Sequence, residues 1–111
     1  MIESVIIAYL NNNLDVPAYA QRPANVNGAF VVVEKTGSST GRKITTSTIA
    51  IQSNADRLLD AAELNEEVKE AMLNIITEDT IGGVQLVSDY NFTNTASKQY
   101  RYQAVFNVTH Y

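Results

Sequence analysis

The fold of this chain is decided by residues 100–110, which read YRYQAVFNVTH. Apolar or aromatic side chains alternate here with polar ones, and Val105 alone breaks the pattern. Because successive side chains of a β-strand point to opposite faces of the sheet, this alternation predicts a strand with one buried and one polar face. The buried set is Tyr100, Tyr102, Ala104, Phe106 and Val108, and the polar set is Gln99, Arg101, Gln103, Asn107 and Thr109.

The segment before this strand is predicted to be its hairpin partner. Residues 84–93 are separated from residues 98–110 by only four residues, 94–97, three of which are polar. Two strands joined so closely are antiparallel neighbours. Residues 80–83 contain two glycines and are predicted to form the turn that precedes this hairpin.

A second hairpin is predicted in the first half of the chain. Residues 29–36 and 43–52 are rich in Val, Ile and Thr. The segment between them, 37–42, is predicted to be a flexible connector. Residues 15–20 contain Pro17, which has no backbone N–H, so only a short or edge strand is expected there.

Two helices complete the predicted elements. In the first, apolar side chains recur at helical spacing until residues 11–13, three asparagines that favour its end. The second is expected over about 55–76, with Ser53, Asn54 or Asp56 as the N-cap. The apolar side of the first helix is Ile2, Val5, Ile6, Tyr9 and Leu10, and that of the second is Leu58, Ala61, Ala62, Val68, Met72, Ile75 and Ile76.

These elements predict a single α+β domain over residues 1–111, in the order α-β-β-β-α-β-β. Each helix has one apolar side, so both are expected to cover one face of an antiparallel or mixed sheet. The predicted shared core is Val5, Ile6, Tyr9, Phe30, Val32, Leu58, Ala62, Val68, Met72, Leu86, Tyr90, Tyr102, Phe106 and Val108.

Composition and charge exclude several classes of function. The 111 residues include eight Lys and Arg and twelve Asp and Glu, so the net charge is −4, which disfavours specific nucleic-acid binding. Cysteine is absent, so the chain has neither disulfides nor thiolate metal ligands. The longest apolar run, residues 5–10, is far shorter than the ~20 residues of a membrane-spanning helix. We expect a protein made in the cytoplasm that does not enter a membrane.

A glycine-rich segment superficially resembles a phosphate-binding loop. Three residues separate its glycines instead of four, and a strand is expected to follow where a phosphate loop needs a helix N-terminus. We therefore interpret it as a hairpin tip and a candidate assembly loop. Its residues are Gly37, Ser38, Ser39, Thr40, Gly41 and Arg42.

Acidic residues form a stripe along the second helix, opposite its apolar side. Residues 55–79 carry a net charge of −6, whereas the rest of the chain carries +2. The stripe is either a solvated helix face or an electrostatic docking surface. A catalytic carboxylate pair would need an apolar neighbourhood that separates the two pKa values, and the helix pattern places nothing apolar beside these positions. The stripe consists of Asp56, Asp60, Glu63, Glu67 and Glu70.

The remaining candidates for chemistry are weak. His110 is the single histidine and lies next to the C-terminal residue, so neither a catalytic triad nor a zinc site is predicted. We expect no enzyme activity, no cofactor and no metal. Alternate aromatic residues, Tyr90, Phe92, Tyr100, Tyr102 and Phe106, are interpreted as core and not as a base-stacking platform. A polar sheet face that includes Thr45 and Ser47 is either solvated or a partner surface.

Four segments resemble those of a known protein family. Residues 49–53 (IAIQS) run into 58–72 (LLDAAELNEEVKEAM), and 31–37 (VVVEKTG) and 100–108 (YRYQAVFNV) fit the same pattern. Together they resemble the small tail-completion proteins of siphophages and Gram-positive prophages, known as tail terminator or tail-to-head joining proteins. The likeness in element order extends over essentially the whole chain.

This resemblance implies an α+β structural protein of the virion. Such a subunit caps the growing tail tube, stops its polymerisation and presents a surface to the head connector, acting in a ring that is usually hexameric and has no cofactor. The implied partners are other copies of the chain, the tail tube protein and a head connector or head-completion protein, at the tail–head junction. The alternatives are a head-completion or minor capsid component, or an enzymatic or small-molecule-binding α+β domain with an enclosed apolar pocket.

Overall fold

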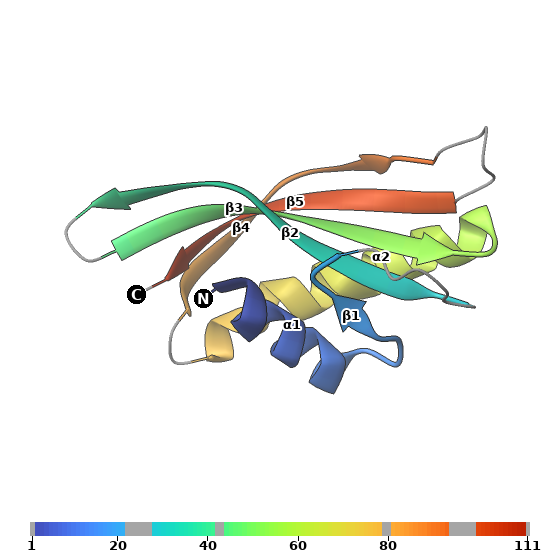
Figure 1. Cartoon of the computed structure of the whole chain (residues 1–111), viewed down its shortest axis with the longest axis horizontal. Coiled ribbons are helices and arrows are strands. Elements are labelled where there is room, and N and C mark those ends of the chain that lie inside the picture. The colour runs from blue at the N-terminus through green and yellow to red at the C-terminus, as the bar shows by residue number, and fades with distance from the viewer. Residues whose placement is uncertain (1, 22–27, 42–43, 79–80, 94–99, 111) are drawn as a thin grey trace.

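The computed structural model describes residues 2–21, 28–41, 44–78, 81–93 and 100–110 (Figure 1). The first half contains helix α1 (Ile2–Asn13) and strands β1 (Ala18–Tyr19), β2 (Phe30–Gly41) and β3 (Ile44–Ala55). The second half contains helix α2 (Leu58–Leu73), a 3₁₀ turn η1 (Ile75–Thr77), and strands β4 (Ile81–Asn91) and β5 (Tyr100–His110). The predicted α+β class and order of elements are confirmed.

The strands form one mixed sheet in the order β1-β2-β3-β5-β4. β1 is parallel to β2, whereas the other three pairings are antiparallel, including the two predicted hairpins. β1 has only two residues and lies at the edge, as Pro17 predicted. The side chain of Asn11, near the end of α1, accepts a hydrogen bond from the Ala18 N–H at 2.9 Å and so ties this short strand to the helix.

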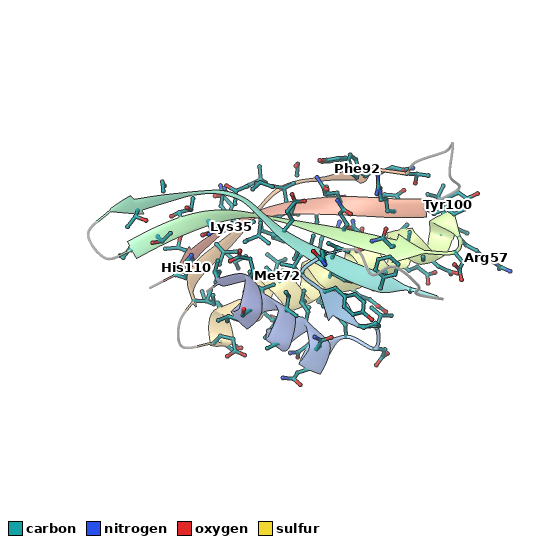
Figure 2. All side chains as sticks on the ribbon, in the orientation of Figure 1. Lys35, Arg57, Met72, Phe92, Tyr100 and His110 are labelled. Carbon is teal, nitrogen blue, oxygen red and sulfur yellow. The ribbon has the colours of Figure 1, made fainter. Side chains whose placement is uncertain are left out.

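Both helices cover the same face of the sheet, and a single hydrophobic core lies between the two layers (Figure 1). Met72, labelled in Figure 2, is fully buried in this core. The alternation predicted for β5 is confirmed for Ala104, Phe106 and Val108, which are fully buried. Tyr100 and Tyr102 are only half-buried, so the prediction that Tyr102 belongs to the core is wrong. The core combines Ile2, Ile6, Tyr9 and Leu10 of α1 with Leu64, Val68 and Met72 of α2 and with Val31, Val33, Ile49 and Ile51 of the sheet.

Helix α2 is shorter than predicted at both ends. It starts at Leu58, after Arg57 at the N-cap, which makes no side-chain capping bond. Ser53 and Asn54 belong to β3, because β5 continues to pair with this strand as far as Ala55. Leu58 and Ile76, at the ends of the predicted helix, are exposed.

Leu64 and Asn65 face the sheet from α2, although neither was in the predicted apolar stripe. Asn65 is almost completely buried, and its side-chain oxygen has no hydrogen-bond partner among the described residues. A polar residue at a buried helix position has no signal in the hydrophobic pattern, which explains why sequence reasoning missed it.

Two turns that the sequence predicted are strands in the structure. Residues 37–41 belong to β2 and pair with 44–48 of β3, so the prediction of a flexible connector is wrong for them, while Arg42 lies outside the described residues. Ile81, Gly82 and Gly83 belong to β4, where Ile81 pairs with His110. In both places the neighbouring strand supplies hydrogen-bond partners, although the register shifts between Ile81 and Gly83. This pairing overrides the local preference of Gly and Ser for turns.

A β-bulge in β4 changes which of its side chains face the helices. Leu86 pairs with Phe106 and Ser88 with Val105, so Val87 is an extra residue on this strand. Side chains after the bulge therefore point to the face opposite to the one that simple alternation predicts. Tyr90 pairs with Gln103 on the outer face, and the prediction that Tyr90 and Phe92 are core residues is wrong.

The predicted faces of β2 and β3 also need correction. Ser47 pairs with Val108, so Thr45 and Ser47 lie on the helix-covered face and not on the polar one. Phe30 and Val32 are buried, but their partners Asn54 and Gln52 lie on the outer face, outside the main core. There Phe30 packs edge-on against Tyr19 of β1, with ring centroids 6.3 Å apart.

Candidate functional site

The candidate assembly loop is part of a projecting β-arm, which we define as residues 34–41 of β2 with 44–46 of β3. Every residue from Glu34 to Gly41 is exposed, and the two strands extend beyond the helices at one end of the molecule (Figure 1). The arm is held by its backbone ladder and by a hydroxyl contact of 3.1 Å between Thr40 and Thr45. It presents small polar side chains on a regular strand.

The acidic stripe lies on the exposed side of α2, as predicted. Asp60, Glu63, Glu67 and Glu70 are exposed on the helix, and Asp56 is exposed just before it. These carboxylates make no ion pair with a described residue. The stripe therefore leaves negative charge available to a cationic partner.

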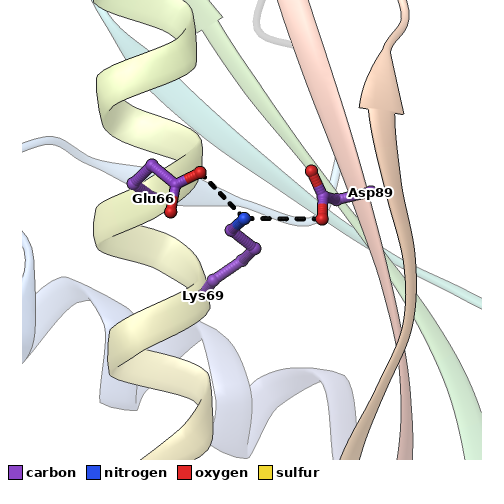
Figure 3. A network of polar contacts seen from close by, with 3 residues as sticks. All are labelled: Glu66, Lys69 and Asp89. Carbon is purple, nitrogen blue, oxygen red and sulfur yellow. Dashed lines mark hydrogen bonds and ion pairs between the residues drawn. The ribbon is translucent and has the colours of Figure 1, made fainter.

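A neighbouring ion-pair network joins α2 to the edge strand β4 (Figure 3). Lys69 Nζ lies 2.8 Å from a carboxylate oxygen of Glu66 and 3.4 Å from one of Asp89. The hydrogen bond to Glu66, with the charge of Asp89, raises the pKa of Lys69 above its usual value. Sequence reasoning missed this network because the bulge at Val87 is what turns Asp89 toward the helix.

Two open grooves border α2. One, of about 330 Å³, lies between the end of α1 and α2, where Asp15, Glu67 and Glu70 contribute to its lining. The other, of about 450 Å³, lies between α2 and β4 and has Leu73 and Leu86 on its wall, with Glu66, Glu67, Lys69 and Glu70 also lining it. Both are open to solvent, whereas a small-molecule site usually encloses most of its ligand.

Tyr9 is one of the residues that line the first groove. Its hydroxyl donates a 2.7 Å hydrogen bond to the carbonyl oxygen of Ala71 and so connects the two helices. Burial, together with the negative charge of Glu78, raises the pKa of Tyr9. This tyrosine therefore stabilises the packing of α1 against α2.

The outer face of the sheet carries side chains that bond to one another. Gln52 donates to Gln103 at 3.2 Å, and Gln103 donates to the hydroxyl of Tyr90. Thr48 donates to Asn107 at 3.1 Å. The polar positions of β5 are thus on this face, as predicted, except that Gln99 lies outside the described residues.

Arg101 and Phe92 form an aromatic and cationic cluster on the outer face of the sheet, next to the end of β4. The guanidinium of Arg101 lies 4.6 Å from the centre of the Phe92 ring, and its Nε donates to the Phe92 carbonyl. Figure 2 shows Phe92 on the side of the sheet away from the helices. The ring is 39% exposed, so the cluster is a surface feature and not part of the core.

His110 has a partner that the sequence did not indicate. Its Nε2 lies 2.8 Å from the Ser47 hydroxyl oxygen, because both residues face the helix side on adjacent strands. Ser47 is only 1% exposed, so a substrate has no access to its hydroxyl group. The pair satisfies a buried hydroxyl and does not have the arrangement of a nucleophile and its base.

Comparison with known proteins adds no assignment. No protein-family model matches the chain, and no curated protein matches its sequence. Among the described residues, no three His, Asp or Glu side chains gather closely enough to hold a metal ion. None of the described helices is both long and apolar enough to cross a membrane.

Proposed function

We propose that this chain is a structural subunit of a phage or prophage virion, of the tail terminator type. It caps the tail tube, ends tube polymerisation and joins the tail to the head as a hexameric ring. Its partners are other copies of itself, the tail tube protein and a head connector or head-completion protein. It is made in the host bacterial cytoplasm, acts at the tail–head junction, and has neither catalytic activity nor a cofactor.

The projecting β-arm is the observation that supports this proposal most directly. An exposed two-stranded arm is marginally stable by itself and is suited to contacts with a neighbouring subunit. The two open grooves, by contrast, favour a protein-binding role over the alternative of an enclosed ligand site. The segments 49–53 and 58–72, which carry the resemblance to tail terminators, form consecutive parts of β3 and α2.

A shortened arm tests the proposal. Deleting residues 40, 41, 44 and 45 removes two paired positions from each strand, and an even number preserves the facing of the remaining side chains. We expect a folded protein, checked by circular dichroism and thermal unfolding, that fails to restore uniform tail length to phage lacking the gene. Electron microscopy then shows tubes of uncontrolled length, whereas the wild-type gene restores them.

A second measurement locates the protein and counts its copies. Antibody labelling of intact particles is expected at the tail–head junction, and cross-linking on purified tails is expected to give six-subunit products. Tails of normal length in the absence of the gene would overturn the proposal. Labelling on the capsid shell would instead favour the head-completion or minor capsid alternative.

A further inference from the structure

We infer that copies of this chain join head-to-tail through the two edges of the sheet, with the β-arm of one copy beside β4 of the next. This inference rests on the proposed ring and specifies the contact between its subunits. It assigns Lys35 of one copy to the groove between α2 and β4 of its neighbour.

The first edge is the outer side of β2. β1 pairs only with Val31 and Val32, so no described strand pairs with this side of β2 from Glu34 onward. Residues 34–41 span roughly 27 Å at ~3.4 Å per residue. Their exposed backbone is a template for another strand, and the small side chains of Gly37, Ser38 and Ser39 do not obstruct it.

The second edge is β4, which pairs only with β5 among the described strands. Leu73 of α2 and Val87 of β4 are both more than half exposed near this edge. Leu73 and Leu86 together form the apolar wall of the α2–β4 groove, whose lining also holds Glu66, Glu67 and Glu70 and the cation Lys69. This edge therefore combines unpaired backbone, apolar surface and negative charge.

The direction of the strands makes the two edges compatible. β2, β3, β5 and β4 alternate in direction across the sheet, so β2 and β4 run antiparallel to each other. A second copy placed beside the first in the same orientation presents its β4 antiparallel to the β-arm. The alternation then continues from one copy to the next.

The register places matching segments at the same level. Across the sheet, Gly37 pairs with Thr48, Thr48 with Asn107, and Asn107 with Gln85. The arm and the first half of β4 therefore lie at the same end of the sheet. At the opposite end of β2, β1 already occupies the edge, which limits the contact to the arm. The expected contact joins 35–39 of one copy to 83–86 of the next.

Charge supports a second copy as the occupant of the groove. Across the sheet, Lys35 pairs with Ile49, Ile49 with Phe106, and Phe106 with Leu86. All four side chains therefore lie on the helix-covered side of the sheet. An unshifted neighbour therefore brings Lys35 to the groove that Leu86 lines. Lys69 already pairs with Glu66 there, whereas Glu67 and Glu70 make no ion pair with a described residue. The aliphatic part of a lysine packs on Leu86 while its ammonium group reaches the carboxylates. Pairing β4 with β4 would instead bring two acidic surfaces together.

Single-cysteine variants test the inference, because the natural chain contains no cysteine. Gly37→Cys and Gln85→Cys place thiols at the same level on the outer face of the two edges, and a Cβ at Gly37 meets no atom within 4 Å. Under oxidation at high protein concentration, a mixture of differently tagged variants is expected to give the heterodimer. Either variant alone is expected to stay largely monomeric, as is a mixture of either one with Ala8→Cys.

Charge exchange tests the position of Lys35. Lys35→Glu is expected to lower the heterodimer yield at least tenfold, and adding Glu70→Lys to the Gln85→Cys partner is expected to restore much of it. Homodimers of one variant, or a yield no higher than that of the Ala8→Cys control, would overturn the inference.

The same variants on particles separate this inference from the proposed function. If the protein caps tails but its 37–85 pair does not cross-link there, the edge contact is wrong and the tail role stands. If the pair cross-links in solution while tails without the protein are normal, the edge contact stands and the tail role is wrong.

Discussion

At the scale of single residues, stability depends on a few buried side chains and on one hydrogen bond between the helices. Phe106 is fully buried at the centre of the core, and Tyr9 links α1 to α2 through the Ala71 carbonyl. Charged residues contribute less to stability, because the stripe carboxylates are exposed and surface ion pairs are weak.

Truncation of Phe106 to alanine is expected to destabilise the fold by about 3–5 kcal/mol, because it leaves a cavity in a fully buried site. Chemical denaturation of the purified variant measures this loss. Val105→Ala on the opposite face of the same strand is the matched control and is expected to cost much less. A loss below about 1 kcal/mol for Phe106→Ala would contradict the burial of this strand face.

Tyr9→Phe is expected to reduce stability by about 1 kcal/mol at neutral pH, through loss of the hydrogen bond to Ala71. The raised pKa of Tyr9 also predicts a pH effect. The unfolded chain loses this proton more readily, so stability is unaffected below about pH 10 and falls as the pH rises through the folded-state pKa. Urea unfolding at pH 8 and pH 11 should show a smaller decline in Tyr9→Phe than in the wild type. An equal decline in both proteins would exclude Tyr9 as its source.

At the scale of elements, irregularities within strands decide which side chains meet. The bulge at Val87 turns Asp89 toward Lys69 and turns Tyr90 toward Gln103 on the outer face. A second irregularity, between Lys35 and Gly37, marks where β2 leaves the core and becomes the arm. Each changes the facing of all residues beyond it, since the side-chain period of a strand is two.

Deletion of Val87 is expected to be strongly destabilising although its side chain is exposed. Without the extra residue, Asp89 and Tyr90 exchange faces or the strand loses its pairing, and either outcome costs several kcal/mol. Val87→Ser retains the bulge and is expected to change stability by less than about 1 kcal/mol. Thermal unfolding compares the two variants, and equal stability of the deletion and the wild type would mean that the bulge does not set the facing.

At the scale of the whole molecule, charge and apolar surface are distributed unevenly. The chain has a net charge of −4, and its excess of acids is concentrated in and around α2. The described dimensions, 44 × 25 × 24 Å, reflect a sheet that is longer than the helical layer beneath it. The projecting arm and the acidic helix are thus separate surfaces of one subunit, as a head-to-tail contact requires.

Self-association is expected to weaken as salt rises, because the inferred contact pairs Lys35 with carboxylates on the groove. Screening shortens the range of such interactions from ~10 Å at 0.1 M salt to ~3 Å at 1 M. Sedimentation is expected to show mainly monomer at micromolar concentration, and oligomers at high concentration that decrease with added salt. The neutral substitution Lys35→Gln should remove most of this salt dependence. Wild-type association that strengthens with salt would instead indicate a mainly apolar contact.

The sequence by itself determined the elements whose hydrophobic pattern is continuous. Helical spacing identified α1, alternation identified the buried face of β5, and Pro17 limited β1 to the edge. The exposed position of the acidic stripe followed from the same helical spacing. These features depend on local periodicity, to which every residue of the segment contributes.

Only the tertiary structure decided the ends of the elements and the facing of side chains after a bulge. Residues 37–41 have the composition of a loop, yet they form a strand because β3 supplies the hydrogen-bond partners. The contacts of Lys69 with Asp89 and of Ser47 with His110 join residues distant in the chain. Such contacts depend on strand register and on one extra residue in β4, and neither changes the composition or periodicity from which sequence predictions are made.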